Sequence, residues 1–309
     1  MSKTIFVFPG QGAQYVGMGK ALAESFEPAR LLLEKADDTL GFSLSKVMFE
    51  GPEADLKMTS NTQPALFASS MMVLEVLKAE GIGFDMVAGH SLGEYSAICA
   101  AGGFSFEDGL KLVRVRGTLM AKAGEENPGA MAAVIGASEE KVLELCAAVK
   151  SVGLVVPANF NCPGQIVVSG EAPAVARLVE NCAAEGVKAV SLAVSGAFHS
   201  PLMQGAQAGL AEAIGNVEFR DLQKPLIANV TASSVTSAKE IRELLVRQLV
   251  SPVRWSQSMT YAIKDCGVTS GVEVGVGHVL SGLERKIDRS VKFTAVESVE
   301  AVKALKGAL

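Results

Sequence analysis

The sequence predicts an α/β fold, with a mainly parallel sheet and a smaller lobe inserted at residues 128–196. Short β-prone runs alternate with helix-prone segments through residues 1–127 and 197–309, as in sheets whose parallel strands are joined by helices. Residues 128–196 instead follow the order β-α-β-β-α-β. The chain has 309 residues, of which 49% are hydrophobic, so it is long enough to bury a large core.

The larger part opens with a β-prone run at 4–8, which ends in the glycine-rich loop PGQGAQYVGMG. Helical periodicity follows through Leu22, Phe26, Leu31 and Leu32, and a second helix is expected from about 63 to 78. The run FDMVAGH predicts a buried strand, and the helix after it stops at AAGG. Ser105 and Asp108 then predict the capped start of another helix.

The inserted lobe begins with GAMAAVIGA, which predicts a strand, and SEEKVLELCAAVK, which predicts a helix. LVVPANFN and GQIVVSG are expected to form two paired strands. A second helix starts near Pro173, a residue suited to a first helical turn, and KAVSLAVSG predicts the last strand. This order is the ferredoxin-like pattern.

After the lobe, the larger part resumes. KPLIANVTA predicts a strand, and Ser237 with Glu240 predicts a capping box at the start of a helix that stops before Pro252. GVTSGVEVGVGHVLSGL predicts a strand, a glycine loop and a helix. The two segments 1–127 and 197–309 are therefore expected to form one α/β subdomain.

Charge and cysteine content exclude several classes of function. The formal net charge is −5, so no basic face indicates binding to nucleic acid or to an anionic membrane. No run of about 18 apolar residues predicts a membrane span. The five cysteines are widely spaced without a CxxC pair, which favours reduced thiols, no metal site and a cytoplasmic location.

The stretch GHSLG contains the first candidate catalytic residue, Ser91. It matches G-x-S-x-G, the turn between a strand and a helix that presents a serine hydroxyl at the carboxyl edge of an α/β sheet. A buried strand is predicted before it and a helix after it, as this turn requires. An ordinary turn serine is the alternative.

A serine nucleophile needs a base, and the chain has three histidines. His90 adjoins the serine on a sharp turn and is expected to pack or to support the site. His199 precedes the N-cap residue Ser200, where the helix N-terminus would keep the imidazole neutral. His278 also lies at a loop–helix junction, and Asp265 before it would complete the usual hydrolase order. Local sequence favours His199 but leaves His278 open.

Arg116 is the most informative charged residue. Its neighbours at helical spacing are all apolar: Leu112, Val113, Leu119 and Met120. Arg114, beside Lys111 and Thr118, is expected to be solvated. A guanidinium on an apolar helix face needs an anionic partner. Two interpretations stay open at this point, an internal salt bridge and a bidentate site for a substrate carboxylate.

The loop GQGAQYVG is only partly similar to a dinucleotide-binding loop. Tyr15 stands where the third glycine would be, and no acidic residue clearly ends a second strand. A loop whose amides turn toward Ser91 is the better interpretation.

Several motifs in register resemble malonyl-CoA:acyl carrier protein transacylases of bacterial fatty-acid synthesis, over essentially the whole chain. They are FVFPGQGAQ, TQPALFASS, GHSLGEYSA, RG after LVRV, GAMAAV, NFNCPGQIVVSG, AFHSPLM and VRQLVSPVRW. The resemblance implies an α/β-hydrolase-like large subdomain with a ferredoxin-like insert. It further implies transfer of a malonyl group from coenzyme A to acyl carrier protein, without a metal or redox cofactor, by a monomer.

The resemblance also assigns site residues. Ser91 would be the nucleophile and His199 the base, which makes His278 structural. Backbone amides of Gln11 and Leu92 would form the oxyanion hole. Three residues would bind the substrate: Arg116, Phe198 and Gln248. Arg116 would hold the malonyl carboxylate, and the backbone carbonyl of Gln248 would orient the histidine. His90 and Asn159 would support them from behind.

Two residues bear on the acyl group. In related acyltransferase domains, a phenylalanine before the histidine and a branched residue after the serine accompany malonyl specificity. Phe198 and Leu92 fit that pattern, because a phenyl ring leaves little room for an α-methyl group. The sequence does not separate a fatty-acid transacylase from a stand-alone polyketide one. A serine thioesterase or esterase and a non-catalytic carrier-binding module are further alternatives.

The surface that would bind acyl carrier protein is only indicated by charge. Carrier proteins are acidic, so a local basic patch is required on this net-negative chain. Arg285, Lys286 and Arg289 are candidates, and a solvated helix face is the alternative.

Overall fold

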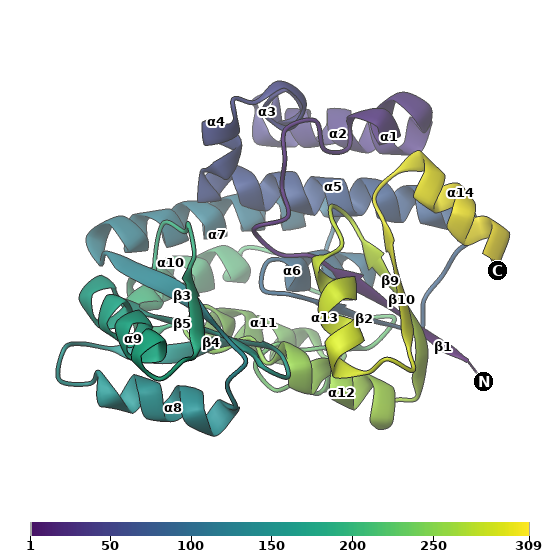
Figure 1. Cartoon of the computed structure of the whole chain (residues 1–309). Coiled ribbons are helices and arrows are strands. Elements are labelled where there is room, and N and C mark those ends of the chain that lie inside the picture. Colours follow the sequence, from purple (N-terminus) through teal and green to yellow (C-terminus); the bar gives the residue numbers. More distant parts are fainter. Residues whose placement is uncertain (1, 309) are drawn as a thin grey trace.

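The computed structural model describes residues 2–308, and Figure 1 shows two sheets with helices packed around them. The larger sheet has six strands in the order β10-β9-β1-β2-β7-β8, of which only the β7–β8 pair is antiparallel. Its strands are β1 (Lys3–Phe8), β2 (Met86–Gly89), β7 (Leu226–Ile227), β8 (Ser234–Val235), β9 (Val268–Val274) and β10 (Lys292–Val296). The predicted parallel α/β sheet is therefore confirmed.

Strand β1 lies inside the sheet and shows why both faces are covered. Phe6 and Phe8 belong to one apolar core, and Ile5 and Val7 belong to another, because successive side chains point to opposite faces. The first core includes residues of α5 (Thr59–Ala79), α6 (Gly93–Ala100), α7 (Phe106–Glu126), α10 (Gln204–Gly215) and α11 (Ala238–Gln248). The second includes residues of α12 (Trp255–Lys264) and α13 (Val279–Ile287).

The remaining helices of the larger part pack at its periphery. Figure 1 shows α1 to α4 above α5, and the last helix near the C-terminus. They are α1 (Lys20–Ser25), α2 (Glu27–Leu40), α3 (Leu44–Glu50), α4 (Glu53–Lys57) and α14 (Val299–Ala308). The helical periodicity expected through Leu31 is interrupted, because Phe26 is extended between α1 and α2. Leu31 is 50% exposed, and Leu33 is buried in its place.

The second sheet is antiparallel, with the order β4-β5-β3-β6. Its elements are β3 (Gly129–Ile135), α8 (Glu139–Ala148), β4 (Val155–Cys162), β5 (Gln165–Glu171), α9 (Ala172–Ala184) and β6 (Lys188–Ser191). This is the predicted β-α-β-β-α-β order. One face packs against α8 and α9, whereas Met131 and Val167 on the other face join the main core.

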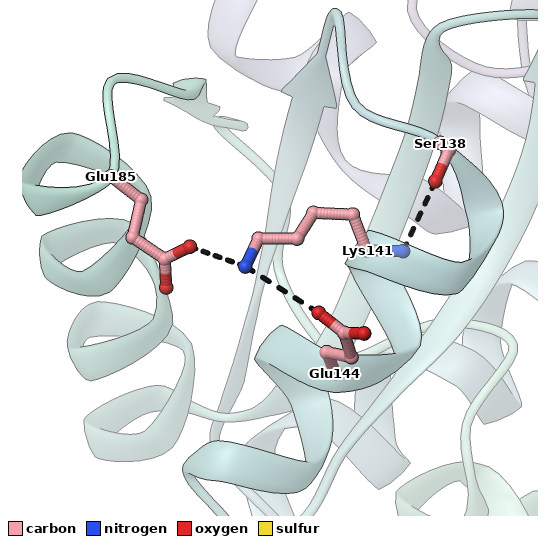
Figure 2. A network of polar contacts seen from close by, with 4 residues as sticks. All are labelled: Ser138, Lys141, Glu144 and Glu185. Carbon is pink, nitrogen blue, oxygen red and sulfur yellow. Dashed lines mark hydrogen bonds and ion pairs between the residues drawn. The ribbon is translucent and has the colours of Figure 1, made fainter.

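Polar contacts connect the two helices of this lobe, as Figure 2 shows. Ser138 caps α8 by accepting a hydrogen bond from the Lys141 backbone N–H at 3.2 Å. The ammonium group of the same lysine pairs with Glu144 and with Glu185, which follows α9. These groups are exposed, so the contacts set geometry more than stability.

A backbone bridge joins the small sheet to the larger part of the chain. The Phe160 N–H donates to the Val253 carbonyl at 2.9 Å, and the Val253 N–H donates to the Ala158 carbonyl at 2.8 Å. Asn159 lies between these two bonds. The edge strand β4 is thereby held beside the segment that leads into α12.

One predicted helix start is different in the structure. Ser237 is the N-cap residue of α11, but its side chain makes no capping hydrogen bond. The Asp221 carboxylate accepts from the Ala238 N–H at 2.8 Å instead. The predicted capping box with Glu240 is therefore wrong, and a carboxylate from another segment caps the first turn of α11 instead. The Ser105 cap of α7 is confirmed, with the Asp108 N–H donating to Ser105 Oγ at 3.1 Å.

Within residues 2–308, no helix has the length and apolar character needed to cross a bilayer. All five cysteines are free thiols. No group of three or more His, Cys, Asp or Glu side chains in the described part of the chain is placed to bind a metal ion.

Candidate active site

The site begins where two adjacent parallel strands end. Phe8 at the end of β1 pairs in register with Gly89 at the end of β2. The loops that carry Gln11 and Ser91 therefore leave the sheet at the same edge, where parallel α/β sheets bind ligands. Both residues line one cavity of about 440 Å³.

Ser91 lies on a tight turn between β2 and α6. Its φ is 52°, a left-handed value that is uncommon for a residue with a side chain. A Cβ at Gly89 would lie 1.9 Å from the Gly93 carbonyl, and one at Gly93 would lie 2.0 Å from the Phe8 carbonyl oxygen. Gly89 is thus required for the tight turn itself, and Gly93 for the close approach of the turn to β1.

His199 is the histidine in contact with this serine. Its Nε2 atom lies 2.7 Å from Ser91 Oγ. Its Nδ1 atom lies 2.9 Å from the Gln248 carbonyl oxygen and 3.2 Å from the Ser251 carbonyl oxygen. Carbonyl oxygens only accept hydrogen bonds, so Nδ1 carries the proton and Nε2 has a free lone pair. That lone pair can accept the serine proton.

Burial first, and then the nearby Arg116 charge, lower the pKa of His199 to about 3. The imidazole is therefore neutral near pH 7, as expected, but the main cause differs from the one predicted. Ser200 does cap the following turn, with the Leu202 N–H donating to its Oγ at 3.3 Å. That turn, η1 (Pro201–Met203), has three residues, and desolvation outweighs any effect of its N-terminus.

Arg116 reaches the same serine from α7 and is 1% exposed. Its Nη2 donates to Ser91 Oγ at 3.1 Å and to Gln248 Oε1 at 3.0 Å, and its Nη1 donates to Gln63 Oε1 at 2.9 Å. All three acceptors are neutral, and Nε has no partner among the described residues. The predicted alternative of a direct internal salt bridge is therefore wrong.

Arg114 was expected to be solvated, and this is wrong. Its side chain is half-buried and its Nη1 donates to the Ser60 carbonyl at 2.6 Å and to Asn61 Oδ1 at 2.5 Å. Its guanidinium also lies over the Phe42 ring. The start of α5 and Phe42, in the loop before α3, approach this side of α7, which local helix spacing does not reveal.

The predicted oxyanion-hole residues are beside the serine. Gln11 and Leu92 both line the cavity. Leu92 is the N-cap residue of α6, whose N-terminal amides face the serine turn. Neither backbone N–H donates an intramolecular hydrogen bond within residues 2–308. Both remain available to a negatively charged oxygen.

Three other predicted residues also line the cavity: Phe198, His90 and Asn159. Phe198 precedes the histidine and is nearly buried. His90 Nε2 pairs with Asn161 Oδ1 at 2.9 Å, so the residue beside the nucleophile contacts the small sheet. Gln248, in contrast, is fully buried and does not line the cavity. It contacts Arg116, His199 and the Ser91 carbonyl from behind, so it can act on the substrate only through these residues.

His278 and Asp265 are exposed, and neither lines the cavity. His278 is the N-cap residue of α13. No hydrogen bond joins it to the serine in the described residues, and the serine hydroxyl is already paired with His199. Arg285 and Lys286 in the last turn of α13 are exposed, as is Arg289, which follows the helix.

Comparison with known proteins shows the family to which this chain belongs. Residues 5–303 match the model of the acyl transferase domain family. A Bacillus subtilis protein named malonyl CoA-acyl carrier protein transacylase is 46% identical over 304 residues, which cover 98% of this chain and 96% of the relative. This chain belongs to the malonyl-CoA:acyl carrier protein transacylase family.

Solved structures of this family have the same fold. An acyl-carrier-protein S-malonyltransferase from Bartonella henselae superposes with a TM-score of 0.96 at 44% identity, covering 100% of this chain and 99% of that one. A malonyl-transacylase in complex with a type II polyketide acyl-carrier protein gives a TM-score of 0.96 at 39% identity, covering 100% of both chains.

Three buried polar residues of the site were not identified from sequence: Glu94, Asn229 and Gln63. Asn229 Oδ1 accepts from the Ser91 N–H at 2.8 Å, and its Nδ2 donates to the Gly89 carbonyl at 2.7 Å. Glu94 Oε1 accepts from the Asn229 N–H at 2.8 Å, and its other oxygen accepts from Gln248. The sequence did contain features that point to these residues. Asn229 is a polar residue just after a strand, and Glu94 and Gln63 are polar residues inside apolar helices.

Proposed function

We propose that this chain transfers the malonyl group of malonyl-CoA to the phosphopantetheine thiol of acyl carrier protein, through a malonyl ester on Ser91. The observation that carries the proposal is the pair of contacts on Ser91 Oγ, with a neutral imidazole on one side and a buried guanidinium on the other. The imidazole supplies a base, and the guanidinium supplies a binding site for an acyl group that ends in a carboxylate. The product would supply the extender units of fatty-acid synthesis.

In the first half-reaction, His199 Nε2 takes the proton from Ser91 Oγ as the oxygen attacks the thioester carbon. The Nδ1–H bond to the Gln248 carbonyl holds the ring in the required tautomer and stabilises the imidazolium that forms. The amides of Gln11 and Leu92 stabilise the oxyanion. The carbon–sulfur bond then breaks, and coenzyme A leaves as the thiol after His199 returns the proton.

Arg116 would couple recognition to basicity. Its charge contributes to the low pKa of His199 in the free site. A malonyl carboxylate that pairs with the guanidinium offsets this charge, so the imidazole becomes a stronger base when the correct acyl group is bound. An acetyl group has no such carboxylate and does not produce this effect.

In the second half-reaction, the carrier thiol attacks the malonyl ester with His199 as base, and Ser91 is released. Arg116 holds the carboxylate end of the acyl group and thereby keeps the ester away from the line of attack of water. This favours transfer over hydrolysis by a thioesterase route. The chemistry needs only side chains and backbone amides of this chain, without a metal or redox cofactor.

Intact-mass measurement after addition of malonyl-CoA tests the proposal. The protein is expected to gain one malonyl group, the Ser91→Ala variant to gain none, and the exposed control Ser151→Ala to behave as the original. Addition of phosphopantetheinylated carrier protein should then move the group to the carrier. Persistent acylation of Ser91→Ala, or free malonate as the main product, would contradict the proposal.

Three further proposals concern the division into subdomains, the location and oligomeric state, and the surface that binds the carrier. Residues 1–127 and 197–309 would form the catalytic subdomain and residues 128–196 the small one. The protein would act as a cytoplasmic monomer, and the exposed cations Arg285, Lys286 and Arg289 would attract the acidic carrier. A polyketide carrier is an alternative acceptor, given the similarity to a transacylase solved with one. Rates with carriers of both pathways would decide between them.

A further inference from the structure

A chain of side-chain contacts behind the serine links the buried cation to a buried carboxylate. Arg116 Nη2 donates to Gln248 Oε1 at 3.0 Å, and Gln248 Nε2 donates to Glu94 Oε2. No direct ion pair joins Arg116 to Glu94 in the described residues, so one neutral amide separates the two charges. Glu94 is 1% exposed.

The chemistry of the end groups sets the orientation of the central amide. A guanidinium only donates hydrogen bonds and an ionised carboxylate only accepts them. Gln248 must therefore turn its oxygen to Arg116 and its nitrogen to Glu94. The same nitrogen also donates to the Ser91 carbonyl at 2.9 Å, and the Gln248 backbone carbonyl accepts from His199. One residue thus contacts the nucleophile, the base and the cation.

We propose that Glu94 is a positioning residue, which balances the charge of Arg116 through the Gln248 amide while leaving the guanidinium free for the carboxylate of the acyl group. A direct bidentate ion pair would occupy two N–H groups of the guanidinium, whereas the Gln248 amide occupies one. Placement of the carboxylate one amide away keeps the charges balanced in the free protein without that competition. The proposal rests on the proposed function, because it assigns a role in selecting malonyl over uncharged acyl groups.

Besides Arg116, few groups around Glu94 can balance the charge of its carboxylate. The charged or titratable groups that act on it are Arg116 from α7 and Tyr95 from α6 itself. Asn229 and Gln248 are neutral. Its other neighbours, from α6, β7 and α11, are apolar: Ile98, Leu226, Ala228, Ile241, Leu244 and Leu245. Burial raises the pKa of Glu94 to about 7.

Protonation of Glu94 would reverse the chain of contacts. A carboxylic acid can donate, which removes the reason for the Gln248 nitrogen to face it. If the amide then flips, its NH₂ group meets the N–H groups of Arg116, and the guanidinium loses both its acceptor and its orientation. A glutamine at position 94 is expected to have the same consequence at every pH, because it has only one acceptor oxygen. The backbone N–H of Asn229 requires that oxygen, so the NH₂ group of the glutamine faces Gln248 and cannot accept from it.

The experiment compares initial rates of Ser91 acylation by malonyl-CoA and acetyl-CoA, measured by intact mass in rapid-quench samples. In the original protein, the malonyl-to-acetyl rate ratio is expected to fall about tenfold or more as the pH falls from about 8.5 to about 5.5, with a midpoint near 7. Glu94→Gln is expected to give the low ratio across the whole range. Glu94→Asp, which keeps the charge, should restore part of the pH dependence.

The outcomes separate a positioning role of Glu94 from a purely structural one. A matched control, the exposed Glu212→Gln on α10, should reproduce the original profile. If Glu94→Gln keeps the original ratio within about twofold, or lowers both rates equally, Glu94 has only a structural role and the proposal fails. If Glu94→Gln does not fold, a flat ratio in the original protein overturns the proposal by itself. Failure of the proposed function is separate, because Ser91→Ala would then still be acylated.

Discussion

The Nε2 atom of His199 lies 2.7 Å from the Oγ atom of Ser91, although the two residues are 108 positions apart in the chain. The serine follows a strand of the large sheet, and the histidine lies where the chain returns from the small lobe. The whole insert must therefore fold back on the sheet before the pair exists.

Replacement of the base should separate the two candidate histidines. His199→Ala is expected to slow acylation of Ser91 by about 10²- to 10⁴-fold, because the other described side chain in contact with Ser91 Oγ, Arg116, only donates hydrogen bonds. His278→Ala should stay within about twofold of the original, because His278 is exposed outside the cavity. Rapid-quench acylation with malonyl-CoA measures both rates. The opposite ranking would restore the triad of Ser91, Asp265 and His278.

Loss of the guanidinium should affect selectivity more than general reactivity. Arg116→Ala is expected to lower the malonyl-to-acetyl rate ratio by about 10- to 100-fold, the value of lost hydrogen bonds to a charged group. Arg116→Lys should recover part of this ratio, since an ammonium keeps the charge but not the planar fork. Competition between the two thioesters gives the ratio directly. Equal losses for both substrates would mean that Arg116 only supports the structure.

Phe198 should set the size of the acyl group. Phe198→Ser removes the ring from the cavity wall, so acylation by methylmalonyl-CoA relative to malonyl-CoA is expected to rise about 10- to 200-fold. Phe198→Leu keeps most of the bulk and serves as the control. A mixture of the two thioesters, followed by intact mass, measures the ratio. An unchanged ratio in a folded Phe198→Ser protein would exclude this residue as the steric determinant.

A second buried carboxylate should make stability depend on pH. Glu284 Oε1 accepts from the Trp255 indole N–H at 2.8 Å, and burial raises the pKa of this carboxyl to about 8. The native state therefore holds a proton that the unfolded chain releases near its ordinary pKa of 4.5. The stabilisation is fully present below that value and is lost as the pH rises through about 8, by a few kcal/mol.

Glu284→Gln should remove this dependence, because glutamine still accepts from the indole but cannot ionise. The melting temperature of the original protein is expected to fall between about pH 4.5 and pH 8, and that of the variant much less. Trp255 is the only tryptophan, so its fluorescence should titrate near pH 8 in the original protein but not in Glu284→Gln. Glu212→Gln is again the exposed control. Parallel pH curves for all three proteins would contradict the assignment.

Several features of this protein follow from local sequence. The glycines around Ser91 predict the turn because only glycine allows the backbone contacts of Gly89 and Gly93. The apolar neighbours of Arg116 predict its burial, because residues three and four positions apart share a helix face. The order of strands and helices in the insert predicts the topology of the small sheet. Each inference depends on groups within a turn or a strand of one another.

Other features were decided by the tertiary structure. His199 and His278 both lie at loop–helix junctions, and only the packing of the insert against the sheet brings one of them to Ser91. The low pKa of His199 comes mainly from burial, which its own segment does not reveal. The contacts from Arg116 through Gln248 to Glu94 join three helices. Local patterns determine which elements form, whereas contacts over a hundred residues depend on strand register and on which faces meet.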